Sequence, residues 1–146
     1  METVKEYLLH KGYINIKLKL TKTNHFEIKA TINSIKGRFI LDTGASSSCV
    51  GFEACDTFNL IAKDSKIKAA GAGALNMDTK ISKKNTIKIG KWKNKKTDLV
   101  LFDLTHINEA LRAHNTAPVD GIIGADILKK AKAIIDYNSK YLYLKI

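Results

Sequence analysis

The sequence predicts a mostly β domain, either a barrel or a sandwich, that carries one or two short helices. Apolar and polar residues alternate over several short segments, which is the period of half-buried strands, and turn residues separate these segments. The length of 146 residues suits one compact domain, and neither a repeat nor an interior linker divides the chain. We therefore expect a single domain over residues 1–146, with residues 1–12 as a possible N-terminal helical extension.

The first third of the chain is expected to form a helix followed by three strands. Apolar residues near the N-terminus have helical spacing, whereas from Tyr13 onward they alternate with polar residues. The third strand leads directly into Asp42. The expected elements are a helix at Val4–Leu9, strands at Ile14–Leu20, Phe26–Ile32 and Arg38–Leu41, and turns at Thr23-Asn24 and Asn33–Gly37.

The remaining two thirds are expected to contain further strands and short helices. Ser47–Leu60 mixes apolar and small residues and could hold a short helix that ends near Asn59. Helical spacing returns at Thr105–His114 and at Asp126–Ala133. Strands are expected around Ile81, Ile87 and Ile89 and at Asp98–Phe102, Ala133–Asp136 and Tyr141–Ile146, with turns at Gly90 and Asn138-Ser139.

The chain has a large excess of basic residues. Lys plus Arg total 25 and Asp plus Glu total 14, which gives a net charge of +11. Arg38 and Arg112 are the only arginines, and because specific readers of nucleic acids usually need arginine forks, no specific nucleic-acid partner is expected. The scattered lysines, with one dense run at Lys91–Lys96, are typical of a solvated surface. Attraction to acidic partners or anionic surfaces is the alternative.

The cysteines and the N-terminus bear on the compartment. Cys49 and Cys55 are too few for a disulfide framework and lack the companions of a zinc site. We expect buried free thiols, which favours a reducing compartment. Met1–Tyr13 contains no long apolar run, so neither a conventional signal peptide nor a membrane anchor is expected, and the cytoplasm is the default location.

The segment Phe39–Ser47 carries the strongest chemical signal. An apolar strand delivers Asp42 to a tight turn, where Gly44 lets backbone approach a ligand and Thr43 can hydrogen-bond across to a neighbouring loop. Attack of water on a peptide bond needs one group that takes a proton and another that gives one. Two adjacent carboxylates that share a single proton do both. Asp42 would be one half of such a pair; an ordinary turn or N-cap aspartate is the alternative.

Two segments together resemble the aspartic protease family. Asp42–Gly44 with its apolar lead-in matches the signature hydrophobic-hydrophobic-Asp-Thr-Gly-Ala/Ser, and Val119–Leu128 looks like the family's later segment, an apolar pair followed by a glycine and a short helix. The small residues Ala70–Ala74 lie between them, where the family has its flap. The resemblance covers most of Arg38–Ile146 and implies a closed retropepsin-like (acid protease) β-barrel.

The motif occurs once, which resembles the bacterial or cellular retropepsins and not the pepsins, whose doubled chain carries it twice. The resemblance implies a homodimer in which each chain supplies one Asp42 and the threonines at Thr43 lock the two catalytic loops together. Tyr141–Ile146 could supply the interface sheet. Viral retropepsins usually have an acidic residue and an arginine where this chain has Ser46 and Ala125, so viral-style substrate contacts are not implied.

The resemblance also implies the roles of the site residues. Asp42 is the expected catalytic residue, supported by Thr43 and Gly44. Backbone of the flap would close over an extended peptide or protein substrate, although an ordinary loop is the alternative for these small residues. The residues expected to contact substrate are Ala45, Gly71, Ala72, Gly73, Ala74 and Ile122. Neither a metal nor an organic cofactor is expected.

Other chemistry-bearing residues favour structural roles. Asp120 is expected to be a turn residue before Gly121, although a second carboxylate within one chain is the alternative. Asp126 is expected to cap the helix at Ile127. Trp92 is expected to cover a sheet edge, with base stacking as the alternative. The histidines are scattered and predict neither a metal site nor a histidine-based catalytic site: His10, His25, His106 and His114.

The leading functional expectation is therefore an aspartic endopeptidase. A protein that kept the fold as a catalytically silent peptide-binding or dimerisation module is the chief rival, because a fold does not determine a function. Binding of nucleic acid or anionic surfaces through lysines is a third class.

Overall fold

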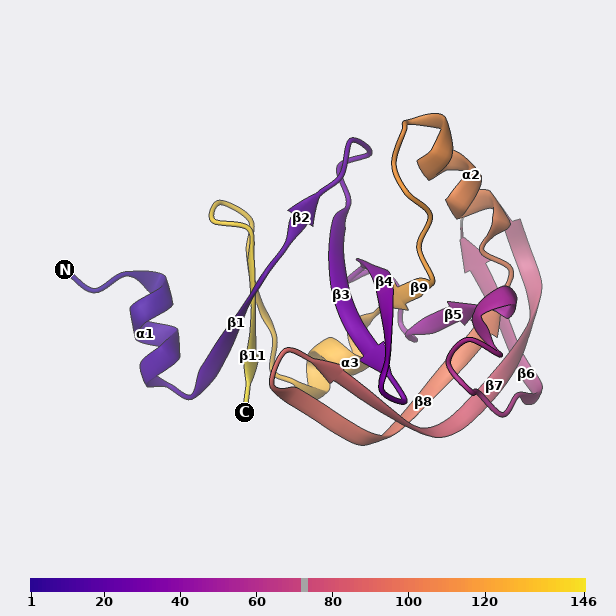
Figure 1. Ribbon diagram of the computed structural model, residues 1–146, viewed down its shortest axis with the longest axis horizontal. Coiled ribbons are helices and arrows are strands. Elements are labelled where there is room, and N and C mark those ends of the chain that lie inside the picture. The colour runs from indigo at the N-terminus through magenta and orange to yellow at the C-terminus, as the bar shows by residue number, and fades with distance from the viewer. Residues whose placement is uncertain (72–73) are drawn as a thin grey trace.

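Strands dominate the structure, a computed structural model that describes residues 1–71 and 74–146 (Figure 1). The predicted helices are present at the N-terminus and in the second half of the chain. In chain order the elements are α1 (Val4–His10), β1 (Tyr13–Lys17), β2 (Lys19–Leu20), β3 (Phe26–Ile32), β4 (Ile35–Leu41), β5 (Cys49–Gly51), the 3-10 helix η1 (Phe52–Ala54), β6 (Lys63–Gly71), β7 (Ala74–Ile89), β8 (Trp92–Phe102), α2 (Thr105–Ala113), β9 (Gly121–Ile123), α3 (Ala125–Lys130), β10 (Ile134–Asp136) and β11 (Tyr141–Lys145).

The larger sheet closes into a barrel. Its strand order is β2-β3-β4-β9-β5-β8-β7-β6, and an additional pairing between β3 and β7 closes the ring β3-β4-β9-β5-β8-β7. Alternate side chains of these strands fill the interior, and each contributes about 1.5–3 kcal/mol by its burial. The most buried strand residues are Ile28, Ile32, Phe39, Val50, Ile87, Ile89, Leu99, Leu101 and Ile123. The mostly β, closed-barrel prediction is confirmed.

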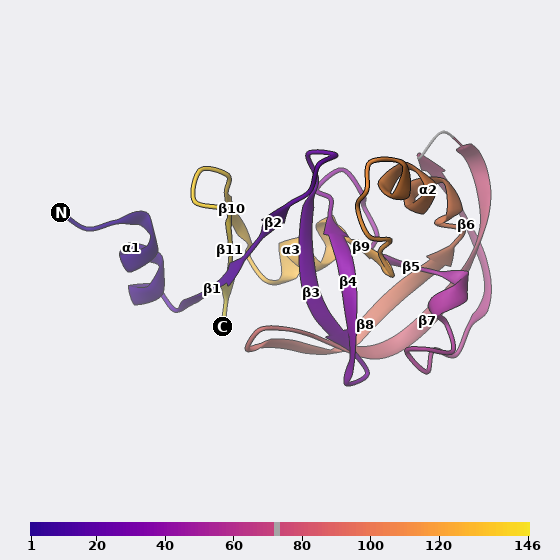
Figure 2. The ribbon, with the colours of Figure 1, turned by 45° about the horizontal axis from the view of Figure 1, so that its top comes forward.

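The chain termini form a second sheet beside the barrel. Its strand order is β1-β11-β10, and Figures 1 and 2 show it with α1 on the left of the barrel, with α3 between the two. Strand β11 is central, and β1 and β10 occupy both of its edges. Leu142, Tyr143 and Leu144 are at most 1% exposed within the single chain. Neighbouring strands of the same chain therefore cover these three residues, which offer no apolar surface to a second copy, whereas Ile146 is 65% exposed; the interface role of Tyr141–Ile146 stays a prediction.

One turn, one segment expected to be helical and the position of Trp92 differ from the predictions. The second turn is confined to Asn33 and Ser34, both at positive φ (50° and 71°), so β4 starts earlier than expected. Ser47–Leu60 forms β5 and one 3-10 turn in place of a helix. Trp92 is buried in the main core and 8% exposed, so it neither covers a sheet edge nor offers its ring to a base. No helix in the described part of the chain is long and apolar enough to span a membrane.

Candidate active site

The loop after β4 holds Asp42 by backbone hydrogen bonds. The Asp42 N–H donates to the Ile123 carbonyl (3.0 Å), which ties the loop to β9, the parallel neighbour of β4. The Gly44 N–H donates to Asp42 Oδ1 (2.8 Å), and the Ala45 N–H donates to the Asp42 carbonyl (3.2 Å). Asp42, Thr43 and Gly44 nevertheless remain exposed. The main chain therefore orients the carboxylate while the residue stays accessible, as expected for a group that acts on a ligand.

Two glycines let β9 pass directly behind this loop. Strand β9 lies between β4 and β5, and a Cβ atom on Gly121 would lie 2.1 Å from the Cys49 carbonyl oxygen. A Cβ atom on Gly124 would lie 2.5 Å from the Ala45 carbonyl oxygen. That oxygen accepts a hydrogen bond from the Ala125 N–H (2.7 Å). Only glycine allows this approach at either position, which explains the glycine of the later motif.

A buried polar network joins the two motif segments. Ser48 Oγ donates to Asp126 Oδ1 (2.7 Å) and accepts a hydrogen bond from the Gly124 N–H (2.8 Å). The Ser48 N–H donates to both carboxylate oxygens of Asp126 (3.0 and 3.1 Å). Asp126 therefore lies within the first turn of α3 and binds Ser48, while Gly124 is the N-cap residue. Asp126 is therefore not the N-cap residue that was expected, but its Oδ1 also accepts a hydrogen bond from the Ile127 N–H (2.8 Å), so one carboxylate serves both the first turn of α3 and the catalytic loop.

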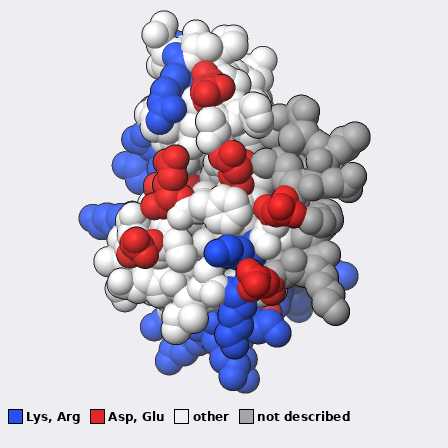
Figure 3. All heavy atoms as spheres, turned by 90° about the vertical axis from the view of Figure 1, so that its right-hand side faces the viewer, with Lys and Arg blue, Asp and Glu red and all other residues white. Residues whose placement is uncertain are grey.

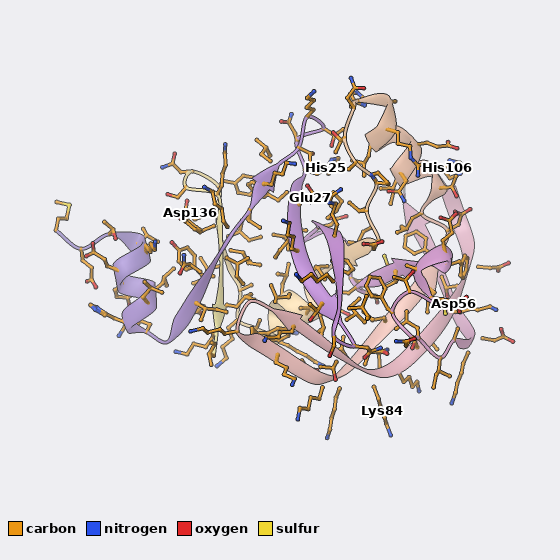
Figure 4. The ribbon with its side chains drawn as sticks, in the orientation of Figure 1. His25, Glu27, Asp56, Lys84, His106 and Asp136 are labelled. Atoms are coloured by element: carbon orange, nitrogen blue, oxygen red, sulfur yellow. The ribbon has the colours of Figure 1, made fainter. Side chains whose placement is uncertain are left out.

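Asp42 opens onto a pocket of about 370 Å³. Its walls combine apolar side chains with two histidines, His25 before β3 and His106 on α2, which Figure 4 places on different elements. The ring atom Nδ1 of His25 lies 2.8 Å from Thr23 Oγ1, and the backbone N–H of His25 donates to Thr21 Oγ1 (3.1 Å). The turn therefore holds both the backbone and the ring of His25. The full lining is Thr23, His25, Ile40, Asp42, His106, Ile107, Ala110, Leu111 and Ile122.

Of the residues named from the sequence, Asp42 and Ile122 line this pocket, and Ala45 packs beside it against the apolar cluster around Ile40. The sequence did not mark His25 or His106 as site residues. They are 106 − 25 = 81 positions apart, and no local pattern pairs them. Only the fold brings the β2–β3 turn opposite α2.

Asp42 is the only carboxylate among the described residues that line its pocket. Asp120 is engaged elsewhere: its Oδ2 accepts from the Arg38 N–H (2.9 Å), and its own N–H donates to the Arg38 carbonyl (2.7 Å). This is the structural role expected for Asp120. A single chain therefore does not place a second carboxylate next to Asp42 in the part that the structure describes.

The hairpin of β6 and β7 occupies the position in the chain where a flap was expected. Gly71 and Ala74 form its last described pair, while Ala72 and Gly73 lie outside the described residues. Figures 1 and 2 show the end of this hairpin next to α2. The role of these four residues as a flap stays a prediction.

Cys49 is a packed thiol next to the site. Burial raises its pKa to about 12, and the nearby carboxylates of Asp126 and Asp42 add to this effect, while a backbone hydrogen bond at Ile122 opposes it. Since only a thiolate is nucleophilic, a cysteine with this pKa does not serve as a nucleophile near neutral pH. Both cysteines are free thiols.

Comparison with known families agrees with this geometry. Residues 28–127 match the family model described as aspartyl protease, which spans more than half of the chain. The chain belongs to the aspartyl protease family. No curated protein sequence matches it significantly.

Solved structures place its fold among the retropepsin-like aspartic proteases. A retropepsin-like aspartic protease from Rickettsia conorii has a TM-score of 0.58 at 23% identity, covering 91% of this chain and 90% of that one. EIAV protease, complexed with the inhibitor HBY-793, has a TM-score of 0.55 at 23% identity over 75% and 90%. The retroviral protease-like domain of Ddi1 from Leishmania major has a TM-score of 0.54 at 16% identity over 86% and 90%.

Proposed function

We propose that the protein is an aspartic endopeptidase whose active site forms when two copies bring their Asp42 carboxylates together. The observation that carries this proposal is an oriented, exposed carboxylate beside which the described lining of its pocket places no second carboxylate. The family match and the retropepsin-like neighbours support the reaction class.

The chemistry needs both copies. A water molecule held between the two carboxylates would lose a proton to the ionised one as it attacks the carbonyl carbon of the scissile peptide bond. The protonated carboxylate would give its proton to the carbonyl oxygen. When the tetrahedral intermediate collapses, the C–N bond breaks and the nitrogen leaves with a proton from the dyad. Two carboxylates at close range share one proton because both cannot ionise together, so the acid and the base coexist at one pH.

The exposed face of the catalytic loop supports a second copy. Thr43 and Gly44 are exposed next to Asp42, and the Thr43 hydroxyl makes no hydrogen bond within the described part of the chain. A hydroxyl that can both donate and accept is suited to pairing with its own copy across a two-fold axis. The pocket beside each Asp42 would then take a substrate side chain on each side of the cleaved bond.

A mixing experiment tests the proposal. Asp42→Asn keeps the shape of the side chain but removes the group that shares the proton, and we expect its peptidase activity to fall by about 10²–10⁴-fold. Wild type mixed with a ninefold excess of Asp42→Asn should retain only about one tenth of its activity per wild-type chain, because random pairing leaves few dimers with two aspartates. Asp56→Asn, which removes one exposed carboxylate elsewhere (Figure 4), is the matched control.

Two results would refute the proposal. Full activity per wild-type chain in the mixture would mean that one chain suffices. Peptide binding without cleavage, equal in wild type and Asp42→Asn, would identify the protein as a silent peptide-binding module.

A further inference from the structure

A second groove lies on the outer face of the barrel, over the part of β4 that is remote from Asp42. Its volume is about 630 Å³, larger than that of the Asp42 pocket. Strands β3, β4 and β7 supply most of its walls, together with the segment that leads to β9. Its lining is Lys29, Ala30, Thr31, Lys36, Gly37, Arg38, Lys88, Gly90, Pro118 and Asp120.

Basic side chains are stacked across the strands in this groove. Thr31 of β3 lies opposite Lys36 on one side and opposite Lys88 on the other. The row continues because Lys88 lies directly opposite Lys93 of β8. One step along β3 on the same face, Lys29 lies opposite Arg38. Residues directly opposite each other in an antiparallel pair share one face, and like charges in this arrangement destabilise a sheet.

Few acidic groups offset this charge. Arg38 Nε lies 2.5 Å from Oε1 of the buried Glu27, so the charge of this arginine is balanced. Lys29, Lys36 and Lys88 form no ion pair within the described part of the chain. Among the described residues of the lining, Asp120 is the only one with a carboxylate. Figure 3 shows acidic side chains spread over the middle of the face that carries α2, while basic ones gather along its lower edge and others lie at its left and among the acidic ones.

We propose that this groove binds an acidic polypeptide segment. Facing lysines destabilise a sheet, and unfavourable positions of this kind that lack a compensating contact are expected to serve a function. An anionic ligand would supply the negative charges that these lysines lack. The described lining contains no aromatic side chain, although sequence-independent binding of single-stranded nucleic acid relies on aromatic stacking platforms. Nor do the lining residues that the structure describes include a large apolar side chain of the kind that inserts into a lipid surface. An extended polypeptide with alternating acidic residues fits a concave row of lysines.

The groove and the Asp42 pocket share one strand. Arg38 precedes Asp42 by four residues of β4, which corresponds to roughly 13 Å along an extended strand. A protein substrate longer than the pocket can therefore reach both places. Resting on the proposed peptidase function, the groove would select substrates that carry an acidic stretch away from the cleaved bond.

Binding can be tested without catalysis. The Asp42→Asn protein is titrated with a fluorescent twelve-residue glutamate-rich peptide and with its glutamine counterpart, at low and at physiological salt. We expect the acidic peptide to bind more tightly and to lose affinity as salt rises. Lys36→Gln with Lys88→Gln should weaken it by about 3- to 30-fold. Lys129→Gln with Lys130→Gln, two exposed lysines of α3, removes equal charge elsewhere and should change affinity less than twofold.

A second readout separates a binding site from a structural one. Because Lys88 faces Lys93, Lys88→Gln should raise the melting temperature by about 1–3 °C while it weakens binding. Equal binding of the two peptides, or equal losses from the groove and α3 variants, would overturn the proposal. Tighter binding of single-stranded RNA or of anionic vesicles by the same lysines would also overturn it. Binding of the acidic peptide by a protein that cleaves nothing would refute only the peptidase function.

Discussion

Removal of the Ser48 hydroxyl should damage the junction behind the catalytic loop. Ser48 is fully buried, and its Oγ both donates to Asp126 and accepts from the Gly124 N–H. In Ser48→Ala the Gly124 N–H loses its partner, and the Asp126 carboxylate loses one of its donors. A neutral hydrogen bond contributes about 1 kcal/mol and one to a charged group about 1.5–3 kcal/mol. We expect the free energy of unfolding to fall by about 2.5–4 kcal/mol.

Thermal and chemical unfolding measure this loss directly. For a chain of this size the expected fall in melting temperature is about 7–15 °C. Ser46→Ala and Ser47→Ala are matched controls, since both side chains are exposed in the same loop. Surface changes of this kind stay within about 0.5 kcal/mol. Asp126→Asn combined with Ser48→Ala should be clearly non-additive, because the two side chains share one network. A Ser48→Ala protein as stable as Ser46→Ala would show that this hydroxyl does not stabilise the junction.

Three further predictions follow from the site. Gly124→Ala should destabilise the protein strongly and abolish activity, since its Cβ would meet the Ala45 carbonyl oxygen at 2.5 Å; thermal unfolding and a peptidase assay check this. Because burial raises the pKa of Cys49 to about 12, its thiolate is scarce below that pH, and a thiol reagent at pH 8 should leave native Cys49 unmodified while Cys55 reacts. Ala110→Phe should fill the Asp42 pocket and raise KM for peptides with large side chains, whereas Ala113→Phe, exposed on the same helix, should not.

The sequence predicts the barrel because its strands are half buried. The structure buries the apolar residues that alternate along Phe26–Ile32, as the sequence pattern predicts, because a period of two fixes which side chains of a strand face inward. The apolar strand that leads into Asp42 was predicted in the same way. The resemblance to the aspartic proteases implied the glycine of the later motif, and the structure supplies its physical reason, since a Cβ atom at Gly124 would meet the Ala45 carbonyl oxygen. Motif and periodicity therefore predict the catalytic loop and the strand behind it.

Contacts between distant segments were not predictable from these patterns. Ser48 and Asp126 are 78 positions apart, and in the sequence Ser48 does not differ from Ser46 or Ser47. His25 and His106 meet at one pocket only because a turn and a helix lie opposite each other. Periodicity shows that a face is apolar but not which element covers it.

The C-terminal strand β11 cannot be deleted to test dimerisation without also removing part of the core. Leu142, Tyr143 and Leu144 are buried in strand β11, which lies between β1 and β10, so deletion of Tyr141–Ile146 removes core packing whether or not this segment also contacts a second copy. Each large buried side chain that is lost costs about 2–5 kcal/mol, so three of them cost about 6–15 kcal/mol, which is comparable to the total stability of a typical domain, about 5–15 kcal/mol. We expect the truncated chain to be unfolded by circular dichroism at every concentration. A folded, inactive monomer would contradict this and return β11 to the dimer interface. If the truncated chain is unfolded, dimerisation has to be measured on the intact chain, by sedimentation and activity over a dilution series. In that chain the outer strands of the small sheet, β1 and β10, are the ones that could pair with a second copy.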